Sequence, residues 1–263
     1  MASFLNYRDI DFKIEDSVFH AERVDLSIQS SVDPIILSDG SLLDYSPSTN
    51  VVGSLSFDFY LTGAIPSYFN VTGVDESAVK VNFAEVEIKN CYLVDLSFSL
   101  EPFQPLLFSA EFDWYGNINV EDFTEQSEAN RKNKSVPNYI AHAAKSYVDK
   151  ESLDVGNIVS LSYNSSCDRP AYFNQDETVP FRVAKLNKRC EVSLQSNSLG
   201  EMVSTKGKKA ETNIIIKDFY GTEMHSFNIS GVLTQQNYNI SNRSYMLSNA
   251  SIEQVVTENK VLI

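Results

Sequence analysis

The dominant pattern along the chain is an alternation of apolar and polar residues with a period of two. This period is typical of a β-strand that buries one face and exposes the other to water. Gly, Pro, Asn and Asp interrupt the runs at intervals typical of antiparallel sandwiches and barrels. The alternating runs lie at residues 24–29, 55–61, 81–88, 96–100, 107–115, 191–195, 213–217, 225–231 and 238–241. The sequence therefore predicts a mainly β fold.

One segment has a different period. The apolar residues of Tyr139–Val148 fall at helical spacing, and Pro137 and Asn138 stand just before it, where they can cap a helix start. We therefore expect one helix, in the middle of the chain.

An internal repeat is the most informative signal in the sequence. Asp25–Ser30 matches Glu191–Ser196 position by position, because both segments place acidic, apolar and hydroxyl residues in the same order. Two further matches follow in the same order, namely Asp58–Tyr60 with Asp218–Tyr220 and, more loosely, Tyr92–Ser99 with Leu233–Ile240. The alternative to duplication is that any two acidic strands resemble one another. A match without gaps followed by a second in order favours duplication.

The repeat predicts the domain organisation. We expect two tandem, related antiparallel β-sandwich or barrel-like domains, with one helix in the segment that connects them. The expected boundaries are 1–116 for the first domain, 117–179 for a polar connector or insertion that carries the helix, and 180–263 for the second domain.

The charge of the chain argues against nucleic-acid binding. Asp and Glu number 35 against 21 Lys and Arg, which gives a formal net charge of −14. Such a chain repels phosphates unless it carries a local basic patch. The densest basic stretches, 131–134 and 206–209, are short and contain no aromatic residue, so we interpret them as solvated loops.

No catalytic motif is present in the sequence. His20, His142 and His225 lie far apart, and no nucleophile elbow, zinc-protease pair or phosphate-binding loop occurs. Glu85 and Glu87 are expected on one face of a strand, as in paired-carboxylate enzymes, but such a pair is more often a solvated or lumen-facing stripe. We therefore expect no enzymatic activity, no catalytic or cofactor-binding residues and no cofactor.

The cysteines and the tryptophan are also assigned structural roles. Cys91, Cys167 and Cys190 form no pair with metal-ligand spacing, so we expect no metal site and buried or incidental thiols. Trp114 is expected to be a core or interface aromatic residue. No apolar run approaches the length of a membrane span, and we expect no signal peptide at the start.

The pattern resembles the tail-tube proteins of tailed bacteriophages and their relatives in contractile injection machines. The residues that carry the resemblance are two hairpin-forming segments, Asn90–Leu100 with Leu107–Phe112, and a second, weaker copy at Ser230–Ser241. They are similar to the closing hairpin of that family. The resemblance covers both halves of the chain but not 117–180. Many family members have one such domain, so two copies change how a ring closes.

The resemblance implies a structural virion protein that is assembled in the host cytoplasm. Its copies would stack as rings, hexameric or pseudo-hexameric trimers, into a channel that conducts DNA without binding it, together with other tail proteins. Alternatives are another β-sandwich virion protein (head decoration, neck or baseplate) and a non-catalytic binding module or adhesin. Because Leu106–Ala110 carries no charge, we also expect it to be an open edge that pairs with a neighbouring subunit.

Overall fold

The computed structural model of the 263-residue chain describes residues 12–29, 32–47, 52–62, 65–69, 78–83, 86–102, 104–120, 139–148, 151–153, 158–175, 177–196, 209–218, 220–239 and 247–256. The fold is mainly β, as expected, and no described helix reaches seven residues. Among these residues, no helix has the length and apolar character needed to cross a membrane.

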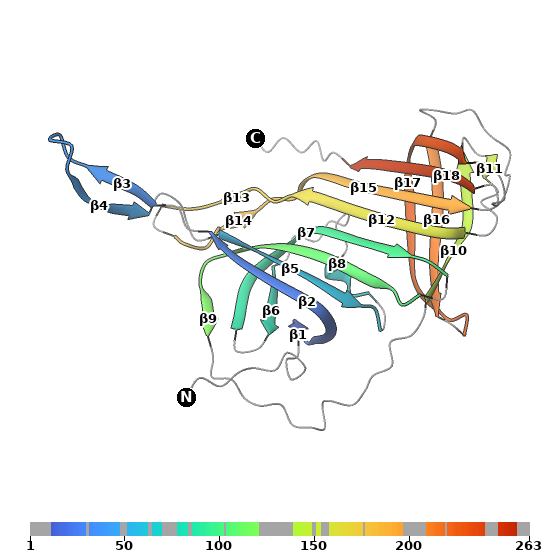
Figure 1. Ribbon diagram of the computed structural model, residues 1–263, viewed down its shortest axis with the longest axis horizontal. Coiled ribbons are helices and arrows are strands. Elements are labelled where there is room, and N and C mark those ends of the chain that lie inside the picture. Colours follow the sequence, from blue (N-terminus) through green and yellow to red (C-terminus); the bar gives the residue numbers. More distant parts are fainter. Residues whose placement is uncertain are drawn as a thin grey trace, which may run out of the picture.

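Six strands of the first half close into an antiparallel barrel (Figure 1). Around the barrel they are β1 (Phe12–Ile14), β2 (Ser17–Gln29), β5 (Val52–Tyr60), β8 (Leu107–Tyr115), β7 (Val86–Leu100) and β6 (Val79–Phe83). The short strand β1 bridges β2 and β6, and the pairing of β8 with β7 completes the closure. The 3-10 turn η2 (Ser67–Phe69) contributes the buried Phe69 to the core.

The alternating sequence of β5 explains how these strands fill the barrel. Leu55, Phe57 and Phe59 are each at most 1% exposed, whereas the residues between them are half-buried. The rings of Phe57 and Phe112 stack 5.8 Å apart, and those of Phe59 and Phe108 stack 5.4 Å apart. The apolar face of each strand therefore packs inward as a layer of aromatic rings.

Further strands continue from β7. In sheet order they are β12 (Ile158–Asp168), β15 (Leu186–Ser196), β18 (Leu247–Val256), β17 (Glu223–Asn239), β16 (Lys209–Asp218), β10 (Tyr139–Val148) and β11 (Glu151–Leu153). In Figure 1, β10, β16 and the first part of β17 cross β12 and β15 steeply. The buried residues of these strands belong to the same hydrophobic cluster as those of the barrel.

The prediction of a helix at Tyr139–Val148 is wrong, because this segment is the strand β10. It pairs with β16, so that Ala141 lies opposite Ile216 and Ala143 lies opposite Ile214. The two isoleucines are fully buried. The pairing register shifts between Ala143 and Lys145. This bulge breaks the period of two, which explains why the apolar residues fall at a spacing that resembles a helix.

Two hairpins extend from one end of the molecule (Figure 1). The first joins β3 (Val32–Ile36) to β4 (Leu42–Pro47) and lies between β2 and β5 in the chain. The second joins β13 (Ala171–Tyr172) to β14 (Arg182–Val183) and lies between β12 and β15.

A short strand, β9 (Ile118–Val120), pairs with the start of β7. The segment 117–179 thus contributes several strands to the fold.

A continuous polar sheet face as the candidate functional site

The candidate site is one face of an unbroken run of strands. The strands β2, β5, β8, β7, β12, β15 and β18 are hydrogen-bonded to one another in that order. Their apolar residues enter the core, so the residues between them form a polar face on the other side. One row of directly opposed residues on this face is Asp58, Ser109, Ser97, Asn164, Glu191 and Glu253. The next row is Tyr60, Leu107, Ser99, Ser162, Ser193 and Ser251.

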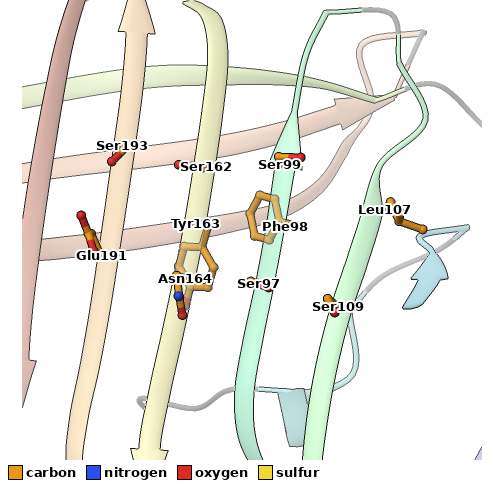
Figure 2. A pocket seen from close by; sticks show the side chains of 10 residues that line it. All are labelled: Ser97, Phe98, Ser99, Leu107, Ser109, Ser162, Tyr163, Asn164, Glu191 and Ser193. Carbon is orange, nitrogen blue, oxygen red and sulfur yellow. The ribbon is translucent and has the colours of Figure 1, made fainter. Parts of the chain in front are cut away.

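A depression of about 490 Å³ lies on this face over β8, β7, β12 and β15 (Figure 2). Its lining consists mostly of small polar residues, namely Ser97, Ser99, Ser109, Ser162, Asn164 and Ser193, with Glu191 at one side. The hydroxyl of Ser109 donates a hydrogen bond of 2.6 Å to Asp58 Oδ1, and the hydroxyls of Ser193 and Ser251 are 2.8 Å apart. No histidine or cysteine is among the described residues that line the depression.

Acidic residues outnumber basic ones on the polar face. The acidic residues on it include Asp25, Asp58, Asp95, Glu111, Asp113, Glu191 and Glu253, and the basic residues include Arg23 and Arg189. Each basic residue lies beside a carboxylate: Arg23 forms an ion pair with Asp25, and Arg189 Nε lies 4.0 Å from Glu253. The face therefore presents excess negative charge among neutral hydroxyl and amide groups.

Three of these carboxylates are close together near the end of the β7–β8 pair. Asp95 lies opposite Glu111, and Asp113 follows on the same face of β8. Burial, with a smaller contribution from the charge of Glu111, raises the pKa of Asp113 from 3.8 to about 6. The same two causes raise the pKa of Asp95. Desolvation and the nearby negative charge therefore disfavour the charged forms of Asp95 and Asp113.

Arg169 is a cation whose charge acts on Asp113 of this cluster. Its side chain is 8% exposed, its Nε donates a hydrogen bond of 2.9 Å to the Leu93 carbonyl, and its guanidinium lies 5.8 Å from the centre of the Tyr92 ring. Its charge lowers the pKa of Asp113, but less than burial raises it. The hydroxyl of Tyr115 donates a hydrogen bond of 3.0 Å to the Arg169 carbonyl and fixes the backbone there.

The histidines that the sequence singled out lie on three different strands. His20 lies on β2, His142 on β10 and His225 on β17. Glu87 pairs with Lys80 at 3.5 Å and Lys89 at 3.1 Å, whereas Glu85 lies outside the described residues, so their expected pairing stays a prediction. The basic stretch 131–134 and most of 206–209 also lie outside them.

The cysteines and Trp114 belong to the core. Cys91, Cys167 and Cys190 are free and buried, and burial raises the pKa of the Cys190 thiol to about 11. Trp114 is fully buried in β8 opposite Gly53, as expected of a core aromatic residue. Across the described part of the chain, no group of three or more His, Cys, Asp or Glu residues has the geometry to hold a metal ion.

The polar face itself was not found by sequence reasoning. Its strands alternate Ser with apolar residues, and this signal predicted strands but not that they join side by side across the two halves of the chain.

Comparison with protein-family models finds no match, and comparison with curated proteins finds none either.

Proposed function

We propose that this chain is a structural virion protein, a component of a tail tube that stacks in rings around a DNA-conducting channel. The observation that carries the proposal is the polar face that runs without a break from β2 to β18 and has excess carboxylates. As the wall of a channel, this face repels phosphates at short range, while its hydroxyl groups keep the surface wetted. DNA then passes without specific binding, and no catalysis is needed.

We further infer that the chain consists of two tandem, related barrel-like domains. Around the first barrel the order is β1, β2, β5, β8, β7 and β6, and the later strands are hydrogen-bonded in the order β12, β15, β18, β17, β16 and β10, where β10 pairs with β16 and not with β12. Each strand of the first series has its counterpart in the second, in the same chain order. The extending hairpins also correspond, because β3–β4 lies between β2 and β5 as β13–β14 lies between β12 and β15.

Sequence supports this correspondence. Aligned on β2 and β12, residues 24–33 and 159–168 share six of their ten residues, which are Val24, Leu26, Ser27, Ser30, Ser31 and Asp33 in the first copy and Val159, Leu161, Ser162, Ser165, Ser166 and Asp168 in the second. The partners agree too: Leu26 lies opposite Leu55, and Leu161 lies opposite Leu194.

The later hairpins share a bulge. The register between β7 and β8 shifts at Val94, and the register between β17 and β18 shifts at Thr234, in each case one residue after a buried leucine. A bulge at the same point of two strand pairs is a feature that duplication explains. The register between β5 and β8 differs by two residues from that between β15 and β18, which leaves the inward faces unchanged.

This correspondence differs from the one expected from sequence. Asp25–Ser30 aligns with residues 160–165 of β12, and the expected partner, Glu191–Ser196, belongs to β15, the counterpart of β5. Short strands with a period of two resemble one another, so a six-residue match alone does not distinguish β12 from β15 as the counterpart of β2. The looser match of Tyr92–Ser99 with Leu233–Ile240 aligns β7 with β17, as the proposed correspondence does, but one residue out of register.

Self-assembly is supported by the exposed apolar residues of the extending hairpins. Ile36, Leu43 and Phe181 are 63%, 61% and 61% exposed. Large apolar side chains gathered on an arm are typical of an interaction surface. In the tail-tube proposal these arms contact the next ring, or other tail proteins. With two domains in each chain, three chains form a pseudo-hexameric ring. Six chains form a larger ring.

The proposal places the protein in the tail of the virion, after assembly in the host cytoplasm. A different virion component, such as a head decoration, neck or baseplate protein, is the second candidate, because exposed apolar arms also suit those sites. A binding module that remains monomeric is the third.

Charge reversal on the polar face tests the channel role. The triple variant Asp58→Lys, Glu111→Lys, Glu191→Lys should still assemble, because these side chains lie outside the core, but its assemblies should retain DNA that the natural protein releases. The control variant Asp16→Lys, Glu101→Lys, Glu211→Lys has the same net charge, its exposed sites lie off both the face and the extending hairpins, and it should retain no DNA. Equal DNA retention by both variants would contradict the channel role.

A further inference from the structure

The pairing partners of β7 change halfway along the strand. Its first part pairs with β6, and its second part, Asp95–Leu100, pairs through the same edge with β12. The opposite edge is occupied by β9 and β8. The two edges are distinguished at Cys91, which pairs with Val79 of β6 and with Trp114 of β8. The β7–β12 pair thus joins the first barrel to the strands of the second half.

The counterpart of this edge on β17 is open in the described structure. The first part of β17 pairs with β16 and the second part with β18, and Val232 pairs with both, so they occupy opposite edges. Beyond Leu233 the edge that continues from β16 has no partner among the described strands. This edge of β17 corresponds to the edge of β7 that pairs with β12. An unpaired row of backbone N–H and C=O groups is a template for another strand.

The counterpart of β12 is β2, and its outer edge is open as well. His20–Gln29 pairs with β5, and no second described strand pairs with it. Its apolar residues are less covered than their counterparts on β12. Ile28 is 57% exposed, whereas Tyr163, at the corresponding position, is 6% exposed. Tyr163 is covered because its ring stacks on Phe98 of β7, with 5.0 Å between centroids.

We propose that β17 of one chain pairs, antiparallel, with β2 of a second copy of this chain, in the register that β7 and β12 use within the chain. Within the chain, Ser99 lies opposite Ser162 and Phe98 lies opposite Tyr163. The two bulged hairpins place Leu233 where Leu93 stands, so Asn239 and Tyr238 take the places of Ser99 and Phe98. Between chains, Ser27 then lies opposite Asn239, and Ile28 lies opposite Tyr238.

This contact is heterologous, because the two edges differ and each chain uses both. Repetition of one heterologous contact generates a ring or a helical filament, according to the rotation between copies. The polar face then continues from chain to chain as it continues from β7 to β12 within one. The inference rests on the proposed function only in that both require self-assembly.

Disulfide trapping tests the register. Residues directly opposite in an antiparallel pair have Cα atoms about 4.5–5.5 Å apart, within the range that a disulfide spans, whereas diagonal neighbours are about 7–8 Å apart. The chain Ser27→Cys mixed with the chain Asn239→Cys should therefore give a covalent dimer under mild oxidation. The chain Ser27→Cys mixed with Asn237→Cys, two residues out of register, should give several-fold less. The natural cysteines are buried and do not compete.

An internal control uses the pair that serves as the template. The double variant Ser99→Cys, Ser162→Cys should form a disulfide within one chain, which shows that this register accepts the bond. If that control forms and the Ser27–Asn239 dimer does not exceed the out-of-register dimer, the proposed pairing is wrong. Rings seen without this cross-link overturn the pairing but not the tube, whereas the specific cross-link in open filaments supports the pairing and contradicts the ring.

Discussion

Tyr163 of β12 lies directly opposite Phe98 of β7, and their stacked rings are 5.0 Å apart. Phe227 of β17 covers both, with centroids 4.8 Å from Tyr163 and 5.4 Å from Phe98. This triple contact brings residues from both halves of the chain into one core, at the seam where the first barrel meets the later strands.

The seam is therefore expected to be important for folding. Tyr163→Ala should destabilise the chain by about 3–5 kcal/mol, because it removes a buried aromatic ring and leaves a cavity. The matched variant Ile28→Ala, at the position of β2 that the proposed duplication aligns with Tyr163, should cost less than about 1 kcal/mol in the dissociated chain. Chemical denaturation of both variants under dissociating conditions measures the difference. Equal losses would show that Ile28 is packed as firmly as Tyr163.

Gly53 is expected to tolerate no side chain. A Cβ at this position of β5 would meet the backbone carbonyl of Ser27 and the ring of the fully buried Trp114. Gly53→Ala should therefore destabilise the protein by about 3 kcal/mol or more, since neither a paired backbone nor a core ring can withdraw. Ser54→Ala, on the polar face of the same strand, should change the free energy of unfolding by less than about 0.5 kcal/mol. A neutral Gly53→Ala in a denaturation experiment would contradict the close packing of β2, β5 and β8.

Asp113 is expected to make stability depend on pH. Its pKa is raised from 3.8 to about 6 in the folded chain, so the folded state binds the proton more tightly than the unfolded state. The stability that this protonation gives is fully present below pH 3.8 and is lost as the pH rises through about 6. After allowance for solvent screening, the loss is about 1–2 kcal/mol.

Asp113→Asn should remove this part of the pH dependence. The neutral amide keeps the size of the side chain, so unfolding free energies measured from pH 4 to pH 7 should decline less steeply in the variant. Glu101→Gln, at an exposed position, serves as the control and should keep the natural slope. A variant that declines as steeply as the natural protein would show that Asp113 is well solvated.

The extending arms are expected to matter for assembly and not for folding. Ile36→Lys combined with Leu43→Lys changes side chains that are 63% and 61% exposed, so stability should change by less than about 0.5 kcal/mol per site. Long polymers should become rare while single rings persist, because charged arms no longer pack on a neighbour. Sedimentation and electron microscopy separate the two species. Ser41→Lys on the same arm is the control for added charge, and unchanged polymer length in the double variant would exclude the arms from stacking.

The sequence predicted local structure well wherever the period of two is unbroken. The alternating runs at 55–61 and 191–195 are strands, and their apolar residues Leu55, Phe57, Phe59, Val192 and Leu194 are buried. The prediction of a helix at Tyr139–Val148 was wrong because a bulge shifts the alternation, and a local pattern does not show the pairing with β16 that makes the segment a strand.

Edges could not be predicted from sequence, because an edge is defined by the partner that a strand lacks. Leu106–Ala110 was expected to be an open edge since it carries no charge, but this prediction is wrong: β8 pairs with β5 on one side and β7 on the other. The alternation of residues 24–29 favours burial of Ile28, yet it is 57% exposed. No described strand pairs with the edge of β2 beside it, whereas β7 pairs with β12 and covers Tyr163, the residue that the proposed duplication aligns with Ile28.

Native mass spectrometry of the purified chain at rising concentration, with negative-stain images of the same samples, tests the central claim most directly. The tube account predicts one dominant closed species, three chains for a pseudo-hexameric ring or six for the larger one, and hollow rings that stack into tubes as the concentration rises. A strictly monomeric protein at every concentration and salt would contradict the account and favour a binding module.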